Sequence, residues 1–298
     1  MYKRQGIATF TFDLYQSFAL QFRDTGSFVV SVNDVKSGYD YPPEVRFTFY
    51  QHAIEEYKDV AYFLNSQQVE IVCLQHEYGI YGGKAGEHIV QLLRELKMPV
   101  VTTLHTVLDK PSPDQYHVMK QIIAYSAKVV VMSEKGRTFL LDVYNAPAEK
   151  IEVIAHGIPD IPFVDAHFYK DIFGLSDRKT LLTFGLLSPN KGIETLISIL
   201  PEVTKSVPNL TYIIVGATHP HLIREHGEAY RDSLIALATK LGVEKHIQFY
   251  NQFVSKRELM EFIGAADIYI TPYLNPTQIT SGTLAYSLGC GKAIISTP

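Results

Sequence analysis

Short apolar runs alternate with amphipathic segments along almost the whole chain. Apolar runs rich in β-branched and aromatic residues predict strands at 28–32, 70–74, 99–104, 129–132, 151–154, 180–184, 210–215, 247–250, 268–271 and 293–296. Helical spacing predicts helices over 6–22, 52–64, 85–96, 116–126, 133–143, 193–204, 230–241 and 257–265, and a last one opened by 278–283 and ended by Gly289. This alternation is typical of parallel α/β sheets, and it predicts two facing Rossmann-like, doubly wound domains.

An irregular, proline-bearing stretch divides the pattern. We expect a first domain over 1–160, a linker over 161–179 and a second domain over 180–298. Gly6 begins a strand-to-helix turn after only five residues, so the first strand of the first domain is expected to be missing. The second domain stops directly after a strand, without a closing helix. We therefore expect a fragment of a longer protein, cut at both ends.

Composition narrows the class of protein. Of the 298 residues, 46% are hydrophobic and 19% charged, as in a soluble globular protein. A net charge of −4 gives no electrostatic footprint for nucleic acid, and no basic amphipathic helix indicates peripheral membrane contact, which stays open. Cys73 and Cys290 are isolated in apolar surroundings, which favours buried thiols in a reducing compartment. Without a leader or a membrane-spanning run, cytoplasmic location is the expectation.

The last predicted helix opens with small, hydroxyl-bearing residues. Thr280, Ser281, Gly282 and Thr283 follow Gln278 and lie after the predicted strand 268–271. Backbone amides at a helix start have no partner inside the helix and lie at the positive end of its dipole, which suits phosphate. The carboxyl end of a strand in an open α/β sheet is also where ligands bind. The segment therefore predicts a phosphate site.

The stretch 266–298 resembles the donor-site signature of the retaining glycosyltransferases of family 4, the glycosyl transferases group 1, which have the GT-B fold. Their signature has Glu, seven residues and Glu, then a glycine-led strand. Here the two acidic positions fall on Gln278 and Tyr286, and 291–295 follows at the matching place. The resemblance implies that Gln278 orients the donor sugar and that Tyr286 faces the ribose.

The loop 185–192 joins a predicted strand to a helix and carries Lys191. A solvated lysine is the simpler interpretation of this turn taken alone. The loop also resembles the family segment Gly-Arg-Leu…Lys-Gly, in which basic residues neutralise the leaving nucleotide. Lys191 matches, whereas Leu186 occupies the arginine position. The resemblance implies that Lys191 stabilises the leaving group and that Gly185 lies in the donor site.

Further donor-side residues follow from the resemblance. His105 ends a buried strand, where a lone histidine is more often structural; the resemblance implies contact with a sugar hydroxyl near the reacting carbon. Gly6 corresponds to a glycine turn against the donor diphosphate. Gly216 ends the strand 210–215, where a glycine lets backbone approach the donor. Phe253 lies at the position that recognises the base largely through main-chain groups.

His76 and Glu77 lie beyond a strand end in the half that the resemblance assigns to the acceptor. Glu77 is expected to hold acceptor hydroxyls, and a capping or surface cluster is an equally good interpretation of the pair. The eleven histidines show no metal-ligand spacing, so no metal is expected. The only expected small-molecule partners are a UDP- or GDP-sugar donor and a hydroxyl acceptor.

The resemblance implies an enzyme that transfers a hexose, such as mannose or glucose, from a nucleotide-diphosphate sugar to a glycan, lipid or other hydroxyl, with retention. Polysaccharide biosynthesis is the expected setting. Two alternatives stay open. A non-hydrolysing sugar-nucleotide epimerase shares the architecture, and the lost Glu, Glu and Arg positions are compatible with a nucleotide-sugar-binding protein without transferase activity.

Overall fold

The computed structural model describes residues 6–162 and 165–297. The chain divides into two compact units, 1–155 and 156–298, which are described one at a time. Both are α/β with parallel sheets, so the predicted fold class is confirmed.

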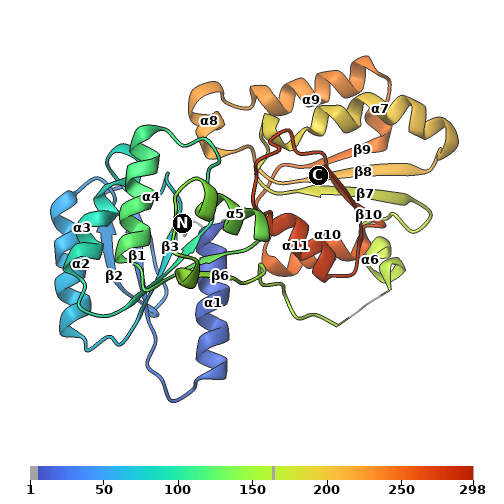
Figure 1. Ribbon diagram of the computed structural model, residues 1–298. Helices are drawn as coiled ribbons and strands as arrows, with labels where there is room; N and C mark the ends of the chain where they lie inside the picture. The colour runs from blue at the N-terminus through green and yellow to red at the C-terminus, as the bar shows by residue number, and fades with distance from the viewer. Residues whose placement is uncertain (1–5, 163–164, 298) are drawn as a thin grey trace. The chain divides into compact units, whose positions relative to one another are not determined.

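The second unit contains a five-stranded parallel sheet with the order β11-β10-β7-β8-β9 (Figure 1). Its strands are β7 (Lys179–Phe184), β8 (Leu210–Val215), β9 (Ile247–Tyr250), β10 (Ile268–Thr271) and β11 (Ala293–Ser296). Its helices are α6 (Ala166–Ile172), α7 (Ile193–Ser206), α8 (Pro220–His226), α9 (Ala229–Lys240), α10 (Lys256–Ala265) and α11 (Gly282–Gly289), with short 3₁₀ turns η3 (Pro189–Lys191) and η4 (Glu244–His246). In the described part of residues 180–298, three elements were not predicted from the sequence: α8 and the 3₁₀ turns η3 and η4.

Two apolar layers sandwich this sheet. Leu181, Tyr212 and Ile214 pack with α7 and α9 on one face, whereas their neighbours Leu182 and Ile213 pack with α10 on the other. Figure 1 shows α7 and α9 on one side of the strands and α10 and α11 on the opposite side. Because successive strand side chains point to opposite faces, a strand covered on both sides must be apolar throughout. This explains why these strands were visible as continuous apolar runs.

The first unit has its strands in two parallel sheets. β1 (Val29–Asn33) pairs with β2 (Val45–Tyr50), and the other sheet has the order β3-β4-β5-β6. Its strands are β3 (Val72–His76), β4 (Val100–Leu104), β5 (Lys128–Val131) and β6 (Ile151–Val153). The sequence analysis missed β2, because charged Arg46 interrupts its run and half of its residues stay partly exposed.

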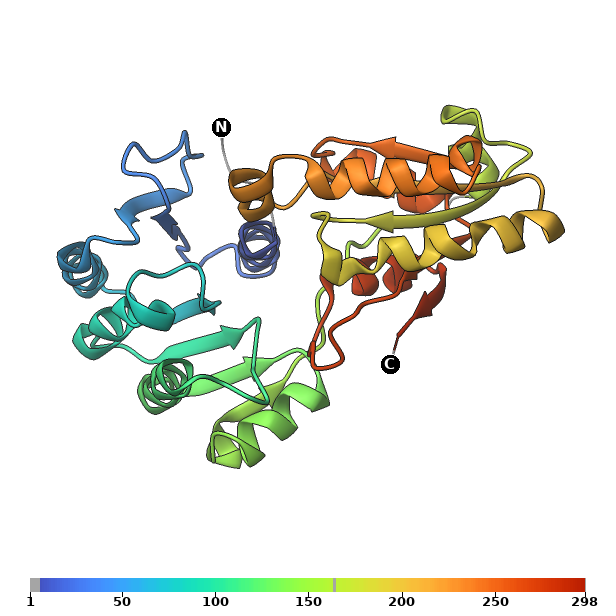
Figure 2. The same cartoon turned by 90° about the horizontal axis from the view of Figure 1, so that it is seen from above.

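Two of the five described helices of the first unit, α4 (Pro113–Tyr125) and α5 (Glu134–Asp142), begin at a serine whose side chain caps the helix. The others are α1 (Ile7–Gln21), α2 (Ile54–Ser66) and α3 (His88–Glu95), with 3₁₀ turns η1 (Lys84–Gly86) and η2 (Ala148–Lys150). α2, α3 and α4 lie side by side (Figures 1 and 2). α4 starts three residues before the predicted bound, because Ser112 and Gln115 form a reciprocal capping box. α3 starts three residues late, because Ala85 has a φ of 52° and interrupts the helix.

The expected linker 161–179 is not irregular throughout, and this expectation needs correction. It contains α6, which packs against α10. The buried Lys170 of α6 donates to both carboxylate oxygens of Asp267, at 2.8 and 2.7 Å. Burial of an ammonium group requires such a partner. The pair ties the segment to the second unit, and periodicity did not reveal this seven-residue helix.

Cys73 was expected to be buried, and this is wrong. It is exposed because β3 lies at one end of its sheet in the described residues and residue 73 alternates away from the core, whereas Cys290 is half-buried. In the described parts of the chain, no helix combines the length and apolar character needed to cross a bilayer.

Candidate functional site

Two glycines bring the carboxyl ends of β7 and β8 into close contact. Gly185 and Gly216 have φ angles of 118° and 144°, a region that favours glycine. A Cβ at Gly216 would lie 2.0 Å from the carbonyl oxygen of Gly185, so no larger residue fits without a backbone shift. The loops then continue side by side, because the amide of Leu187 donates to Ala217 and that of His219 to Leu187. The structure therefore brings these two predicted residues together.

Lys191 ends the short turn η3 and is held against the loop after β10. Gly192 follows with a φ of 62°, and a Cβ there would lie 2.1 Å from the carbonyl oxygen of Pro272. The amide of Leu274 donates to the carbonyl of Asn190 at 3.1 Å. These backbone contacts fix the loop that carries Lys191 beside the residues that lead into α11.

A cluster of hydroxyl groups surrounds the Lys191 ammonium group. Its Nζ donates to the hydroxyl of Tyr273 at 3.2 Å and lies 4.7 Å from the centre of that ring. The Tyr273 hydroxyl is 2.7 Å from Ser281 Oγ and 3.0 Å from Thr283 Oγ1. Tyr269 donates to Thr283 at 2.7 Å. Lys191, Ser281 and Thr283, predicted separately from two motifs, thus share one site with Tyr273, which was not predicted.

The helix start predicted to bind phosphate has the expected local geometry. Ser281 is the N-cap of α11, and its Oγ accepts from the amide of Leu284 at 3.2 Å. Gly282 and Thr283 are the first two residues of the helix, whose amides have no helical partner. Donors at a helix N-terminus beside a lysine form a surface suited to a phosphate group.

The pKa of Tyr273 shows how strongly this cluster stabilises negative charge. Burial raises the pKa of a phenol, but the Lys191 charge and hydrogen bonds from Ser281 and Thr283 outweigh that effect and lower it to about 8. In the described residues, Lys191 has no carboxylate partner. The site therefore carries a net positive charge when Tyr273 is protonated.

Other predicted donor-side residues do not join the cluster through any described contact. Gln278 Nε2 donates to the carbonyl of Thr280 at 2.8 Å, within its own turn. Tyr286 packs against the apolar core of the second unit and lies edge-on to His156, with ring centres 6.0 Å apart. Phe253 lies in the loop after β9, with its side chain exposed. The expected roles of these residues stay predictions.

Two further residues lie in this region: His156, which with Gly157 resembles the domain-junction turn of the family and was expected to be structural, and Arg231, which was not predicted. His156 Nε2 would lie 3.0 Å from a Cβ at Gly282, so the imidazole lies against the start of α11. Arg231 is buried, and its Nη2 donates to the carbonyl of Gly216 at 2.7 Å while Nε donates to Glu228 at 3.3 Å. Arg231 lies on an otherwise apolar face of α9, and this pattern in the sequence could have identified it.

In the first unit, the predicted residues meet at the carboxyl ends of β3 and β4. His105 Nε2 is 2.8 Å from Gln75 Oε1, and its amide donates to the carbonyl of His76 at 3.0 Å. Glu77 accepts from the hydroxyl of Thr106 at 2.5 Å. The structure therefore joins His76, Glu77 and His105 in one cluster, although the sequence analysis assigned them to opposite sides of the reaction.

This cluster is desolvated. His76 is fully buried, and neither ring nitrogen has a partner in the described residues. Burial and, to a lesser degree, His105 lower the pKa of His76 to about 3, so the ring is neutral. Burial also raises the pKa of Glu77, against hydrogen bonds from Thr106 and the Tyr78 amide. His76 therefore contributes packing and no charge at neutral pH.

Gly6 has the strained backbone expected of a tight turn. Its φ is 49° and its ψ is −111°, and it precedes α1. Phe10 of the same helix packs edge-on against His105, with ring centres 4.9 Å apart. The turn is thus connected through α1 to the His105 cluster.

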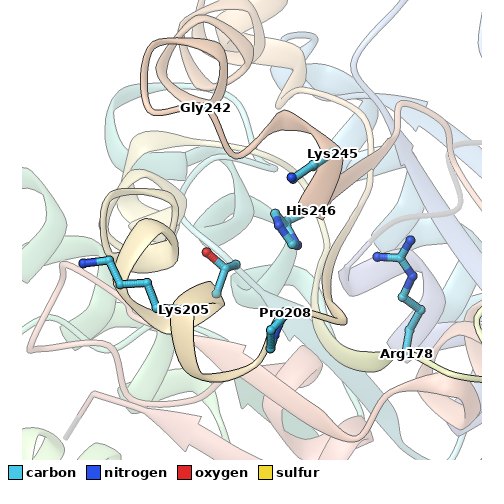
Figure 3. A pocket seen from close by; sticks show the side chains of 7 residues that line it. Arg178, Lys205, Pro208, Gly242, Lys245 and His246 are labelled. Atoms are coloured by element: carbon cyan, nitrogen blue, oxygen red, sulfur yellow. The ribbon is translucent and has the colours of Figure 1, made fainter.

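Within the second unit, a hollow of about 470 Å³ lies at the amino ends of β7, β8 and β9, at the edge of the sheet opposite to Lys191 (Figure 3). It is lined by Arg178, Thr204, Lys205, Pro208, Gly242, Lys245 and His246. His246 Nδ1 is bonded to the carbonyl of Leu210, and Lys205 pairs with Glu202. The carboxyl ends of α7 and α9 meet here, and cations favour that end of a helix. We therefore assign the chemistry to the opposite edge of the sheet.

In the described portion of the chain, no group of three His, Cys, Asp or Glu side chains has a metal-binding arrangement.

Two family models match the chain. "Glycosyltransferase Family 4" matches residues 25–160, and "Glycosyl transferases group 1" matches residues 166–297. The chain belongs to the family 4 glycosyltransferases. The second match covers the loop of Lys191 and the start of α11.

Two related glycosyltransferases each match part of this chain. An uncharacterized glycosyltransferase of Methanocaldococcus jannaschii is 27% identical over 191 residues, 59% of this chain and 46% of that protein. A GDP-mannose-dependent alpha-(1-6)-phosphatidylinositol monomannoside mannosyltransferase of Mycolicibacterium smegmatis is 31% identical over 103 residues, 35% of this chain and 24% of that protein. The chain therefore matches less than half the length of these relatives.

Solved structures support the fold. HepE of Anabaena, in complex with UDP and glucose, superposes with a TM-score of 0.65 over 85% of this chain and 67% of that one, at 18% identity. A likeness at this identity concerns the architecture, which is that of the GT-B glycosyltransferases.

Proposed function

We propose that this chain carries the donor site and part of the acceptor side of an enzyme that transfers a hexose from a nucleotide-diphosphate sugar to a hydroxyl acceptor, with retention. The unit 156–298 would bind the nucleotide sugar, and the unit 1–155 would hold the acceptor. The observation that carries the proposal is the convergence of Lys191, Ser281 and Thr283 at the start of α11.

The chemistry of the leaving group explains why this cluster suits the reaction. When the bond between the sugar carbon and the phosphate oxygen breaks, its electron pair remains on the departing diphosphate. Donors placed in advance around that oxygen stabilise the developing charge without having to reorganise. Lys191 supplies a positive charge, and the hydroxyl groups and first amides of α11 supply neutral donors.

Roles for the other predicted residues complete the proposal. Gly185 and Gly216 would let the backbone approach the nucleotide, and Phe253 would lie near the base. Gln278 would orient the sugar, for which it must leave the carbonyl of Thr280. On the other unit, His105 would contact a sugar hydroxyl, and His76 and Glu77 would shape the acceptor side.

We propose the class of donor, a UDP- or GDP-sugar, and not a particular base or sugar. One relative is named for its dependence on GDP-mannose, and HepE was solved with UDP and glucose. Both kinds of donor are therefore the candidates to screen. Cytoplasmic location, expected from the sequence, remains part of the proposal.

The direct test is nucleotide-sugar binding by the chain and its Lys191→Ala variant, measured as a thermal shift with UDP-glucose and GDP-mannose. Stabilisation by one donor should be lost in Lys191→Ala, because the phosphate contact loses its charge; the affinity should fall by about 100-fold. Lys205→Ala, an exposed lysine at the opposite edge, is the matched control and should bind as the parent does. Absence of any donor response from the folded chain would contradict the proposed function.

A second candidate, a nucleotide-sugar-binding protein without transfer, is favoured by one observation. Gln278 and Tyr286 occupy the positions of the two carboxylates in the resembled signature, and the Gln278 amide is bonded to the carbonyl of Thr280. Donor binding that depends on Lys191, without release of nucleoside diphosphate in a screen of hydroxyl acceptors, would favour this candidate. Release of nucleoside diphosphate with formation of a glycoside would exclude it.

A further inference from the structure

Tyr273 lies at the centre of the polar cluster, although no motif pointed to it. It follows β10 and Pro272, and its hydroxyl contacts one group from each neighbouring element. Lys191 Nζ donates to it at 3.2 Å, Ser281 Oγ lies at 2.7 Å and Thr283 Oγ1 at 3.0 Å. The oxygen of Tyr273 is thus the point on which the donors of the cluster converge.

Among the residues that the structure describes, the groups that act on the phenol include no carboxylate. They are Lys191 from η3, Tyr269 and Thr271 from β10, and Ser281 and Thr283 from the start of α11. The ammonium group also lies over the ring, 4.7 Å from its centre. A cation held by an aromatic face and hydroxyl groups, with no anion beside it, has its charge available for a ligand.

We propose that the Tyr273 hydroxyl donates a hydrogen bond to the diphosphate of the sugar nucleotide, as the partner of Lys191, and thereby takes the place of the cation that Leu186 does not supply. The inference rests on the proposed function. As the bond between sugar and phosphate breaks, the electron pair stays on the phosphate oxygen. The phenol keeps its proton throughout and stabilises that charge by its hydrogen bond.

Only the protonated phenol can act in this way. A phenolate has no proton to donate, and its negative charge would offset that of Lys191 and repel the diphosphate. The pKa of about 8 places this change close to neutral pH. Linkage then requires that a bound diphosphate raise the pKa of Tyr273, because it binds the protonated form more tightly.

The test is isothermal titration of UDP-glucose and GDP-mannose into the chain, Tyr273→Phe and Tyr230→Phe between pH 6.5 and 9.5. For the parent chain, affinity should fall about tenfold per pH unit above pH 8, because binding must first return a proton to the phenol. Tyr273→Phe should bind about tenfold more weakly at pH 7 and show no such decline. Tyr230→Phe also loses a hydrogen-bonded phenol in the second unit, at Glu194, and should retain the parent profile.

A second measurement needs no variant. Phenolate absorbance of the parent chain should show one tyrosine that titrates near pH 8, and saturating nucleotide sugar should shift this titration above pH 9. Parent-like affinity and an unchanged alkaline decline in Tyr273→Phe, or a titration that the ligand does not move, would overturn the inference. A parent chain that binds no nucleotide sugar at any pH would instead overturn the proposed function.

Discussion

The carboxyl edges of the four-stranded sheet in the first unit and of the five-stranded sheet in the second unit have opposite chemistry. In the first unit, His76 is fully buried and neutral and has no hydrogen-bond partner among the described residues, and Glu77 has a raised pKa. In the second unit, half-buried Lys191 lies over the ring of Tyr273, and its charge, with hydrogen bonds from Ser281 and Thr283, lowers the pKa of Tyr273 to about 8. One edge favours neutral groups, whereas the other favours anions.

The difference follows from how each edge is solvated and which donors converge there. At β3 and β4, the aromatic rings of Tyr78 and Tyr81 pack on His76, and burial disfavours a charge on its imidazole. At β7 and β10, a lysine, two hydroxyl groups and a helix start point at one place. A parallel strand–loop–helix arrangement therefore fixes where a ligand can bind, while the side chains around the strand ends decide which ligand it is.

The largest loss of stability should come from Gly216→Ala, which breaks the close backbone contact between Gly216 and Gly185 in the second unit. The new Cβ would meet the carbonyl of Gly185 at 2.0 Å, and the φ of 144° disfavours any side chain. Urea denaturation, monitored by circular dichroism, should show that the free energy of unfolding falls by about 3 kcal/mol or more.

Gly6→Ala in the first unit is the matched control for that substitution. Its backbone is also strained, with a φ of 49°, but its Cβ would meet no atom within 4 Å. The free energy of unfolding should fall by about 1–2 kcal/mol, because only the backbone strain of an alanine at this φ contributes. Equal losses in the two variants would contradict a steric origin for the tight contact at Gly216.

The neutral state of His76 should make the first unit sensitive to acid. The unfolded chain takes up a proton below about pH 6.5, whereas the folded state does so only near pH 3, so stability falls as the pH falls between these values. Between pH 7 and 5 the parent should lose about 2 kcal/mol more than His76→Leu, which cannot titrate. Urea denaturation at both pH values measures this difference.

His246→Leu is a suitable comparison, because that histidine is also buried but has a hydrogen bond to the carbonyl of Leu210. A parent and a His76→Leu variant with the same pH dependence would show that the edge of the first unit accommodates a charged imidazole. That result would remove the contrast between the two edges.

The smallest loss of stability is expected when either of two serines that cap helices is replaced. Ser281 caps α11 and Ser133 caps α5, each accepting from a backbone amide at 3.2 Å. Replacing either by alanine should reduce stability by about 1 kcal/mol. Only Ser281→Ala should also weaken nucleotide-sugar binding, as measured by titration calorimetry. Equal donor binding in the two variants would show that the hydroxyl of Ser281 acts only as a cap.

The sequence alone predicted the parallel α/β architecture and most of its elements. The bounds of β8, β9, β10 and β11 agree with the predicted runs. β8 and β10 are buried on both faces, and such strands are nearly continuous apolar segments. Ser133 was predicted as a cap, since a serine before a first-turn acid indicates a helix start. The glycine loop and the hydroxyl-rich helix start were visible for the same reason: each depends on the local chain.

Only the tertiary structure decided which side chains meet. Tyr273 lies 82 residues from Lys191 in the chain, and α6 joins the second unit through a lysine 97 residues from its aspartate. Gln278, by contrast, bonds within its own turn. Periodicity reports which face of an element is buried, but contacts between distant segments depend on strand order and on the loops that glycines allow. The prediction of a phosphate site at this helix start therefore rested on local information, whereas the contacts of the helix start with Lys191 and Tyr273 followed from the sheet.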